Sequence, residues 1–294
     1  MRHINALAKR NIRLFLRDRS ALFFSFFSSL LVIAIYFIFL AGLNAEELGH
    51  YGFEFEENAK YFIIYIQIIT GVLILNSMTL SAGTFVIIAR DFENRRIDSL
   101  LLTPVKPREL LLGYFISALL VSFIFNCIFW ILSVLLIGAL TGYFISFFTF
   151  AAGFAILLSA SLISASIMLL FTALIKSPAA ISIISSISAT FFGVLCGIYT
   201  SYSILGKGAE TAGSFIPFTH ITILFKQLVL KDALSRFDLP ENIYNNIHDK
   251  LFAARNIGFC GLNTPQWALL LFCGIFAFLC LAAAWLILRR RVVR

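Results

Sequence analysis

The 294-residue chain contains little charge: Asp, Glu, Lys and Arg make up 13% of it, whereas 60% of its residues are hydrophobic. In soluble domains the charged fraction is about a quarter. The apolar residues also occur in runs of about 20 or more, the length needed to cross the hydrocarbon core of a bilayer. An ordinary soluble domain is therefore excluded, and we predict an all-α polytopic membrane protein.

The sequence also lacks the residue clusters that catalysis and metal binding require. The four histidines, His3, His50, His220 and His248, are too scattered for metal-ligand spacing. Of the five cysteines, only Cys260 lies outside the predicted membrane spans, so no disulfide framework is expected. A nucleophile-elbow pattern is missing as well. A membrane-bound enzyme or sensor remains an alternative, but no catalytic cluster supports it.

A nucleotide-binding loop is missing too. Gly206-Lys207-Gly208 resembles part of a phosphate loop, but glycine follows the lysine where Ser or Thr is needed, and Ser201 stands at the position of the first glycine. No cofactor is therefore expected on this chain. The net charge is +8, yet no basic stripe interleaved with aromatic residues lies outside the spans, so nucleic acid is not an expected partner.

Six hydrophobic segments have the length and composition of membrane-spanning helices. As delimited, none of them contains Asp, Glu, Lys, Arg or His. Ion-coupled carriers usually need an ionisable group inside the membrane, so an ion-coupled secondary transporter is the disfavoured alternative, although such a carrier could use backbone carbonyls at broken helices. The expected spans are residues 21–41, 61–88, 110–137, 145–175, 179–200 and 266–288.

The distribution of Lys and Arg predicts that both chain ends are cytoplasmic. Six of these cations precede the first span, five lie in residues 89–108, and four follow the sixth span. The side opposite the N-terminus has seven, six of them in the long loop 201–265, where the positive-inside rule is weak. Residues 89–108 are therefore predicted to be a cytoplasmic loop and residues 201–265 an extracellular one. Helical spacing after Pro217 and Pro240 predicts short helices in the extracellular loop, which are either re-entrant or surface-lying.

Residues 1–20 are predicted to form an amphipathic helix in the membrane interface, with its cations near anionic headgroups. One alternative is a positive flank that only orients the first span. A cleaved signal peptide is disfavoured because residues 21–41 are too long for its apolar core. The apolar side has Ile4, Leu7, Ala8, Ile12 and Phe15, and the cations are Lys9, Arg10, Arg13 and Arg17.

The stretch Asp91–Gly113, DFENRRIDSLLLTPVKPRELLLG, is a dense block of mixed charge between two apolar spans. Ile97, Leu100 and Leu101 recur at i, i+3 and i+4, which places them on one helical face. Thr103-Pro104 then ends the helix, because proline lacks an amide proton and restricts the residue before it. The pattern predicts a short amphipathic helix in the cytoplasmic loop. The alternative is a solvated loop that contains one helical turn.

This stretch resembles the signature region of the type-two ABC exporter permeases. In that family an acidic start leads into a short helix, two leucines, Thr-Pro-Val, and a Leu-Leu-Gly that opens the third span. Arg95-Arg96 stand where the family commonly has Gly-Thr, and Tyr114 stands where a lysine often follows the glycine. The resemblance extends to the basic N-terminal helix, the six spans and the helical segment before the sixth. The matching residues are Glu93, Asp98, Leu100, Leu101, Thr103, Pro104, Val105, Leu111, Leu112 and Gly113.

The resemblance implies a permease subunit of the bacterial cytoplasmic membrane that has no ATPase activity of its own. Two such subunits, identical or related, would bind two copies of a separate ATPase that carries ATP and Mg. The cargo would be amphipathic or lipid-linked, such as a drug, an antimicrobial peptide or a glycan precursor. The implied contacts with the ATPase are the N-terminal helix, with Lys9, Arg10, Arg13 and Arg17, and a coupling helix with Glu93, Arg95, Arg96, Ile97, Asp98, Leu100, Leu101, Thr103 and Pro104.

Overall fold

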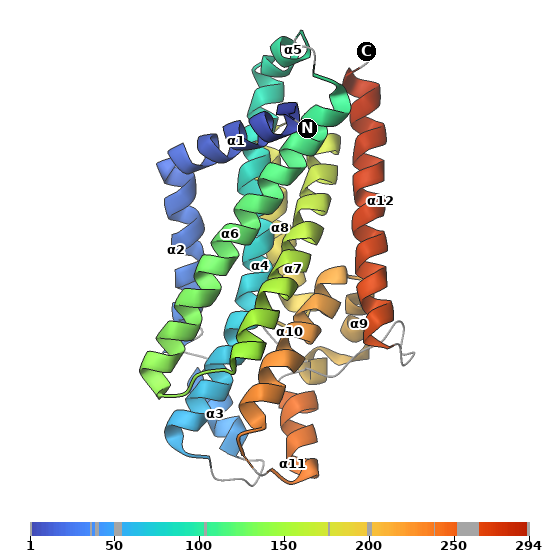
Figure 1. Ribbon diagram of the computed structural model, residues 1–294. Helices are drawn as coiled ribbons and strands as arrows, with labels where there is room; N and C mark the ends of the chain where they lie inside the picture. Colours follow the sequence, from blue (N-terminus) through green and yellow to red (C-terminus); the bar gives the residue numbers. More distant parts are fainter. Residues whose placement is uncertain are drawn as a thin grey trace.

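The fold is an all-helical bundle (Figure 1). This computed structural model describes residues 2–35, 37–38, 41–49, 55–102, 105–175, 177–198, 202–237, 239–251 and 265–292. Nearly all of these residues are helical, and none of them lies in a β-strand. The predicted fold class is therefore confirmed.

In the described part of the chain, five helices are long and apolar enough to cross a membrane. They correspond to the expected second to sixth spans. The expected first span corresponds to α2 (Arg19–Ile35), whose 17 residues rise about 26 Å, slightly less than the roughly 30 Å hydrocarbon core. The five candidate spans are α4 (Glu57–Glu93), α6 (Pro107–Thr141), α7 (Phe147–Leu174), α8 (Pro178–Leu195) and α12 (Gln266–Val292).

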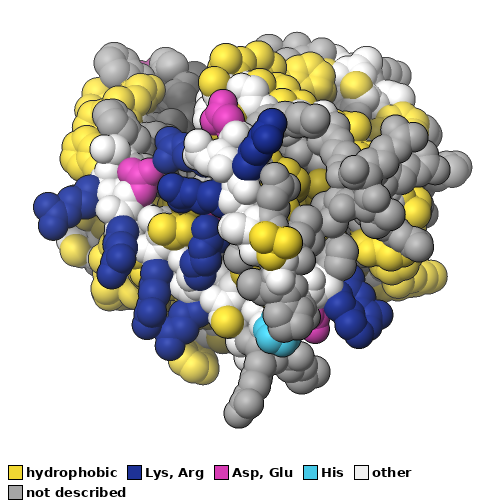
Figure 2. Space-filling view, turned by 90° about the horizontal axis from the view of Figure 1, so that it is seen from above, with side chains coloured by type: hydrophobic (Ala, Val, Ile, Leu, Met, Phe, Trp, Pro, Cys, Tyr) yellow, Lys and Arg dark blue, Asp and Glu magenta, His cyan; other side chains and the backbone are white. Residues whose placement is uncertain are grey.

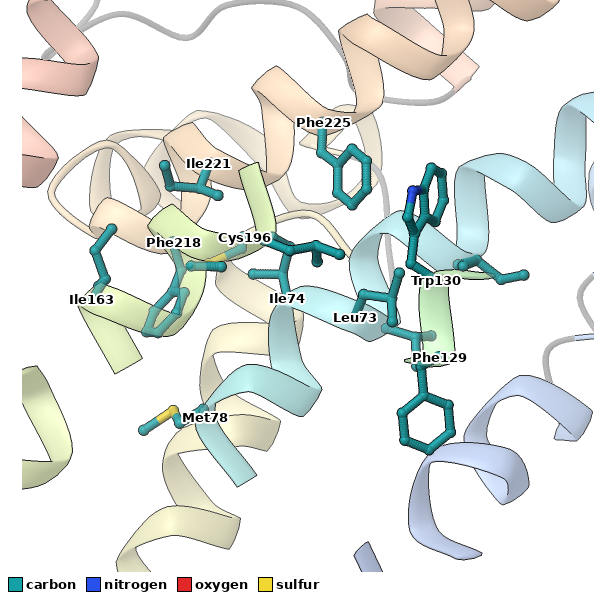
Figure 3. Close-up of a cluster of buried hydrophobic side chains, with 14 of the residues drawn as sticks. Leu73, Ile74, Met78, Phe129, Trp130, Ile163, Cys196, Phe218, Ile221 and Phe225 are labelled. Carbon is teal, nitrogen blue, oxygen red and sulfur yellow. The ribbon is translucent and has the colours of Figure 1, made fainter. Parts of the chain in front are cut away.

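The core of the bundle surrounds α4. In its apolar window, 78% of the residues are buried, compared with 17% for α8 and 22% for α12. Figure 3 shows Leu73 of α4 close to Trp130 of α6, and the Trp130 ring lies 5.1 Å from that of Phe225, centroid to centroid. A helix that is apolar on all sides lies either in a core or in lipid. The core surrounds α4, whereas α8 and α12 leave most of their apolar surface to the membrane or to a partner.

Polar side chains connect α4, α6 and α7 near the middle of the bundle. The Asn126 amide donates to Ser77 Oγ at 2.7 Å and accepts from Asn76 Nδ2 at 3.1 Å. Ser122 Oγ lies 3.0 Å from the Ser77 carbonyl oxygen and 3.2 Å from Ser161 Oγ. Such interhelical hydrogen bonds are worth about 1 kcal/mol each in membranes. This network therefore holds three spans together.

The predicted extracellular loop contains a helix that is inserted into the bundle. After α9 (Tyr202–Ser214), the chain bends by 98° into α10 (Pro217–Leu234). Most of α10 is buried against α4, α7 and α12. By contrast, α11 (Glu241–Asn245), which a π-helical turn at Asn246–Leu251 follows, has no buried residue. The helices of this loop were predicted to be either re-entrant or surface-lying. In the structure α10 enters the bundle, whereas α11 lies at its surface.

The two ends of the bundle differ in what they present. At one end, α1 (Arg2–Arg17) crosses the bundle, α5 (Arg96–Leu101) projects beyond it, and α12 terminates (Figure 1). At the opposite end lie α11 and α3 (Ala41–Gly49), a helix that the sequence analysis did not predict. We call these the α1 end and the α11 end.

Candidate functional site

The candidate site is the α1 end, where α4 carries the following turn out of the bundle. The 37 residues of α4 extend about 55 Å, well beyond the thickness of a bilayer core. The chain then reverses at Asn94 and Arg95. Arg95 has φ +52°, in the left-handed region, and is the only described non-glycine residue with a positive φ. Glycine adopts this conformation without a Cβ clash. The type-two ABC exporter permeases, which this stretch resembles, commonly have glycine at this position.

We expect Arg95→Gly to stabilise the protein. A residue with a Cβ costs about 1–2 kcal/mol in the left-handed conformation, and glycine removes that cost at the expense of a more flexible unfolded chain. The free energy of unfolding in mixed micelles should rise by up to about 1 kcal/mol. Arg95→Ala is the matched control, because it removes the same charged group but keeps the Cβ. Equal effects of the two substitutions would refute strain at Arg95.

The short helix α5 forms where the charge block predicted it, but one of its apolar residues faces the protein. Ile97 is 4% exposed and belongs to the main hydrophobic core, so it attaches α5 to the bundle. The sequence predicted that Ile97 faces a partner, but in the structure its aliphatic side chain packs into the bundle's own hydrophobic core, which removes it from water. Leu102, just after α5, is 90% exposed.

The other residues of the expected coupling helix are described only in part. Glu93, Arg95 and Arg96 are exposed at the α1 end, as a partner contact requires. The contacts expected of the remaining residues stay predictions, because the side chains of Asp98, Leu100 and Leu101, and all of Thr103 and Pro104, lie outside the described part of the chain.

The return of the chain into the bundle is defined by local backbone contacts. Pro107 is the first residue of α6, where its fixed φ suits a helix and its missing N–H is not needed. The Glu109 carboxylate accepts a hydrogen bond from the Lys106 backbone N–H at 3.1 Å. These features fix the start of the third span just beyond α5.

A buried ion pair attaches α1 to the end of α4. Arg10 donates through both terminal nitrogens to Asp91, Nη1 to Oδ2 at 2.8 Å and Nη2 to Oδ1 at 3.1 Å. Tyr114 Oη donates to Asp91 Oδ2 at 3.3 Å, and Arg96 Nη1 lies 3.9 Å from Oδ1. The Asp91 side chain is 2% exposed, and that of Arg10 is 32% exposed. The Arg10 side chain therefore pairs with a buried carboxylate of the protein. The sequence had predicted it to lie with Lys9, Arg13 and Arg17 near the lipid headgroups.

The electrostatics of this cluster favour the ionised pair. A bidentate guanidinium–carboxylate contact is among the stronger hydrogen-bonded pairs in proteins. The hydrogen bond with Asp91 raises the pKa of Arg10, so Arg10 keeps its positive charge. Arg10, Arg96 and Tyr114 thus surround one carboxylate and tie α1, α5 and α6 to α4.

The glycine of the Leu-Leu-Gly motif lies where α1 crosses α6. A Cβ on Gly113 would lie 2.8 Å from Leu7 Cβ, closer than two carbon atoms can pack. The neighbouring Asn11 Nδ2 donates to Ser117 Oγ at 3.4 Å. Phe15 packs edge-to-face against Phe125, with ring centroids 5.9 Å apart. The apolar face of α1 therefore packs on the protein, and its location in the membrane interface stays a prediction.

The outward side of the α1 end is strongly basic. Figure 2 shows Lys and Arg side chains gathered on it, with few acidic ones. Such a surface attracts anionic partners and speeds their association. Its exposed cations include Lys9, Arg13, Arg17, Arg19, Arg90, Arg95, Arg96, Lys106 and Arg108.

Two functionally notable features could not be found by the sequence analysis. Arg10 and Asp91 are 81 residues apart, so no local pattern pairs them. The six spans lack ionisable groups, but α10 brings His220 and Lys226, 1% and 4% exposed, into the bundle. Lys226 Nζ donates to the Gly197 carbonyl oxygen at 2.7 Å, just beyond the end of α8. In α10, the Lys226 side chain therefore makes a structural contact with the end of α8. Among the described residues, no group of potential ligands could hold a metal ion.

Several apolar spans, an inserted helix and a charged end with a projecting helix define a multi-pass membrane protein. The family model for the ABC-2 family transporter protein matches residues 41–286. The chain therefore belongs to the ABC-2 transporter family, as a permease. No curated protein matches it.

Proposed function

We propose that this permease is the membrane subunit of an ATP-driven exporter and that its α1 end binds a separate ATPase. The observation that carries the proposal is α5, anchored through the buried Ile97 while Leu102 stays 90% exposed. An exposed apolar residue within a charged rim has the anatomy of a protein interface. Two ATPase copies would carry ATP and Mg, and a second permease subunit, identical or related, would complete the transporter.

The proposed orientation puts the α1 end in the cytoplasm, where ATP is available. It rests on the excess of Lys and Arg in the short segments at that end. Figure 2 shows Lys and Arg side chains gathered on the outward face of that end. Both chain ends would then be cytoplasmic, in a bacterial cytoplasmic membrane, and α3 and α11 would lie outside.

For the cargo, we propose an amphipathic or lipid-linked molecule, such as a drug, an antimicrobial peptide or a glycan precursor. A cavity of about 510 Å³ lies between α4 and α8, near the junction of α1 and α2. Val86 and Ile87 supply apolar lining, while the hydroxyls of Thr79 and Ser185 supply hydrogen-bonding groups. Arg90 at the rim forms an ion pair with Asp18 at 3.5 Å. Such a mixed lining suits a molecule with a polar and an apolar part.

The purified chain alone should not hydrolyse ATP, whereas co-expression with its ATPase should give a complex that hydrolyses ATP and transports. An ATPase variant that lacks the phosphate-loop lysine is the control. Transport by reconstituted vesicles should need ATP and persist without an ion gradient. Transport that continues without ATPase and collapses with the gradient would instead indicate an ion-coupled carrier.

A further inference from the structure

An apolar groove opens between α7, α10 and α12 toward the α11 end, away from the cavity beside α8. Its volume is about 470 Å³. Small side chains of α7 line one wall and make it concave, and aliphatic side chains of α10 and α12 line the other walls. The lining includes Ala152, Ala155, Ile156, Leu224, Leu228 and Leu270.

A cation lies at the outer end of this groove. Lys231 lines it and is exposed, and within the described residues it forms no ion pair. The adjacent Asp232 is engaged elsewhere: its Oδ2 accepts from the Ser146 backbone N–H at 2.8 Å and lies 3.8 Å from Arg236. The positive charge of Lys231 is therefore available to a ligand.

The length of the groove matches one leaflet of a bilayer. Ile221 and Lys231 line its two ends on α10, and ten residues of helix rise about 15 Å. This is half of the roughly 30 Å hydrocarbon core. Trp267, which is 66% exposed, lies near the start of α12, and tryptophan is typical of the level where headgroups begin.

We propose that this groove is a binding site for one membrane phospholipid with an anionic headgroup. An acyl chain would lie along the small residues of α7, and the phosphate would pair with Lys231. Charge complementarity selects this occupant: the walls are mostly apolar, with Ser159 and Gln227 as their uncharged polar members, and the one cation in the lining stands at the outer end. The proposal is independent of the direction of transport and of the identity of the cargo.

The test is lipid binding to the detergent-purified chain, measured by native mass spectrometry with phosphatidylglycerol and phosphatidylcholine of identical acyl chains. Ala152→Leu should fill the groove and remove tight binding of both lipids. Ala151→Leu adds the same volume on an exposed position outside the groove and should have no effect. Lys231→Gln should lower the affinity for phosphatidylglycerol about fivefold and leave phosphatidylcholine unchanged, whereas Lys60→Gln should change neither.

Four results would overturn the proposal. Unchanged lipid binding by Ala152→Leu would exclude the groove, provided that the variant keeps its unfolding midpoint. Equal effects of Lys231→Gln on both lipids would exclude headgroup recognition. Displacement of the lipid by inorganic phosphate alone would show an anion site that needs no acyl chain. If Ala152→Leu blocked export while keeping its lipid, the groove would belong to the cargo instead.

Discussion

Replacing Arg10 by alanine is expected to detach α1 from the bundle and to abolish assembly with the ATPase. The substitution leaves Asp91, whose side chain is 2% exposed, without its bidentate partner. Removing one member of a buried ion pair typically costs about 3–5 kcal/mol. The free energy of unfolding in mixed micelles should fall by up to that amount, because Arg96 and Tyr114 still contact Asp91. The co-purified ATPase should be lost at equal membrane abundance.

Replacing Asp91, the other member of the ion pair, should destabilise the protein less than replacing Arg10, because the two side chains are buried to different extents. Asp91→Asn leaves Arg10 without its carboxylate partner, but the Arg10 side chain is 32% exposed and can be hydrated. A loss of about 1–3 kcal/mol is expected, that of a hydrogen bond to a charged group. Arg13→Ala, at an exposed position one turn along α1, is the control and should stay within about 0.5 kcal/mol. If Arg10→Ala were as mild as Arg13→Ala, the ion pair would not hold α1.

Leu102→Asp is expected to leave the permease folded but to remove its binding to the ATPase. Leu102 is 90% exposed, so the bundle loses little when it is replaced. Burying a leucine in an interface contributes about 1.5–3 kcal/mol, and an aspartate there would also have to be desolvated. Affinity for the ATPase should therefore fall at least tenfold, measured by titration of the purified ATPase against the reconstituted permease.

Two further substitutions separate docking from folding. Ser99→Asp introduces the same charge at an exposed polar position of α5 and should have a small effect on affinity. Ile97→Asp should instead lower the unfolding midpoint and the yield, because Ile97 is 4% exposed and part of the core. If Leu102→Asp bound the ATPase as well as the unsubstituted chain does, Leu102 would be merely solvated.

The spans could be predicted from the sequence because an uninterrupted apolar run of membrane length is typical of a membrane-spanning helix. The insertion of α10 could not, because Lys226 and His220 interrupt its apolar pattern and make it resemble a surface helix. Its burial depends on the carbonyl of Gly197 and on close contact with α4, which only the assembled bundle provides.

The short helix between the second and third spans could be predicted from the sequence, but the contacts around it could be predicted only in part. Helical spacing correctly grouped Leu7, Ala8 and Phe15 on the buried face of α1, but periodicity does not say whether that face meets lipid or protein. In the same way, it does not say whether Ile97 faces the bundle or a partner. The pairing of Arg10 with Asp91 joins distant segments, so no local pattern carries it. Arg95, which adopts a left-handed backbone conformation, stands where the ABC-2 permeases commonly have glycine.

The most direct test of ATPase coupling at the α1 end is site-specific cross-linking within the co-expressed complex. A photo-cross-linker attached to cysteine at Leu102 should capture the ATPase subunit, whereas one at Asn245, in α11 at the opposite end, should not. We expect a cross-link to the ATPase from Leu102 and none from Asn245. Capture from Asn245, or no capture from Leu102 in an assembled and hydrolysing complex, would contradict it.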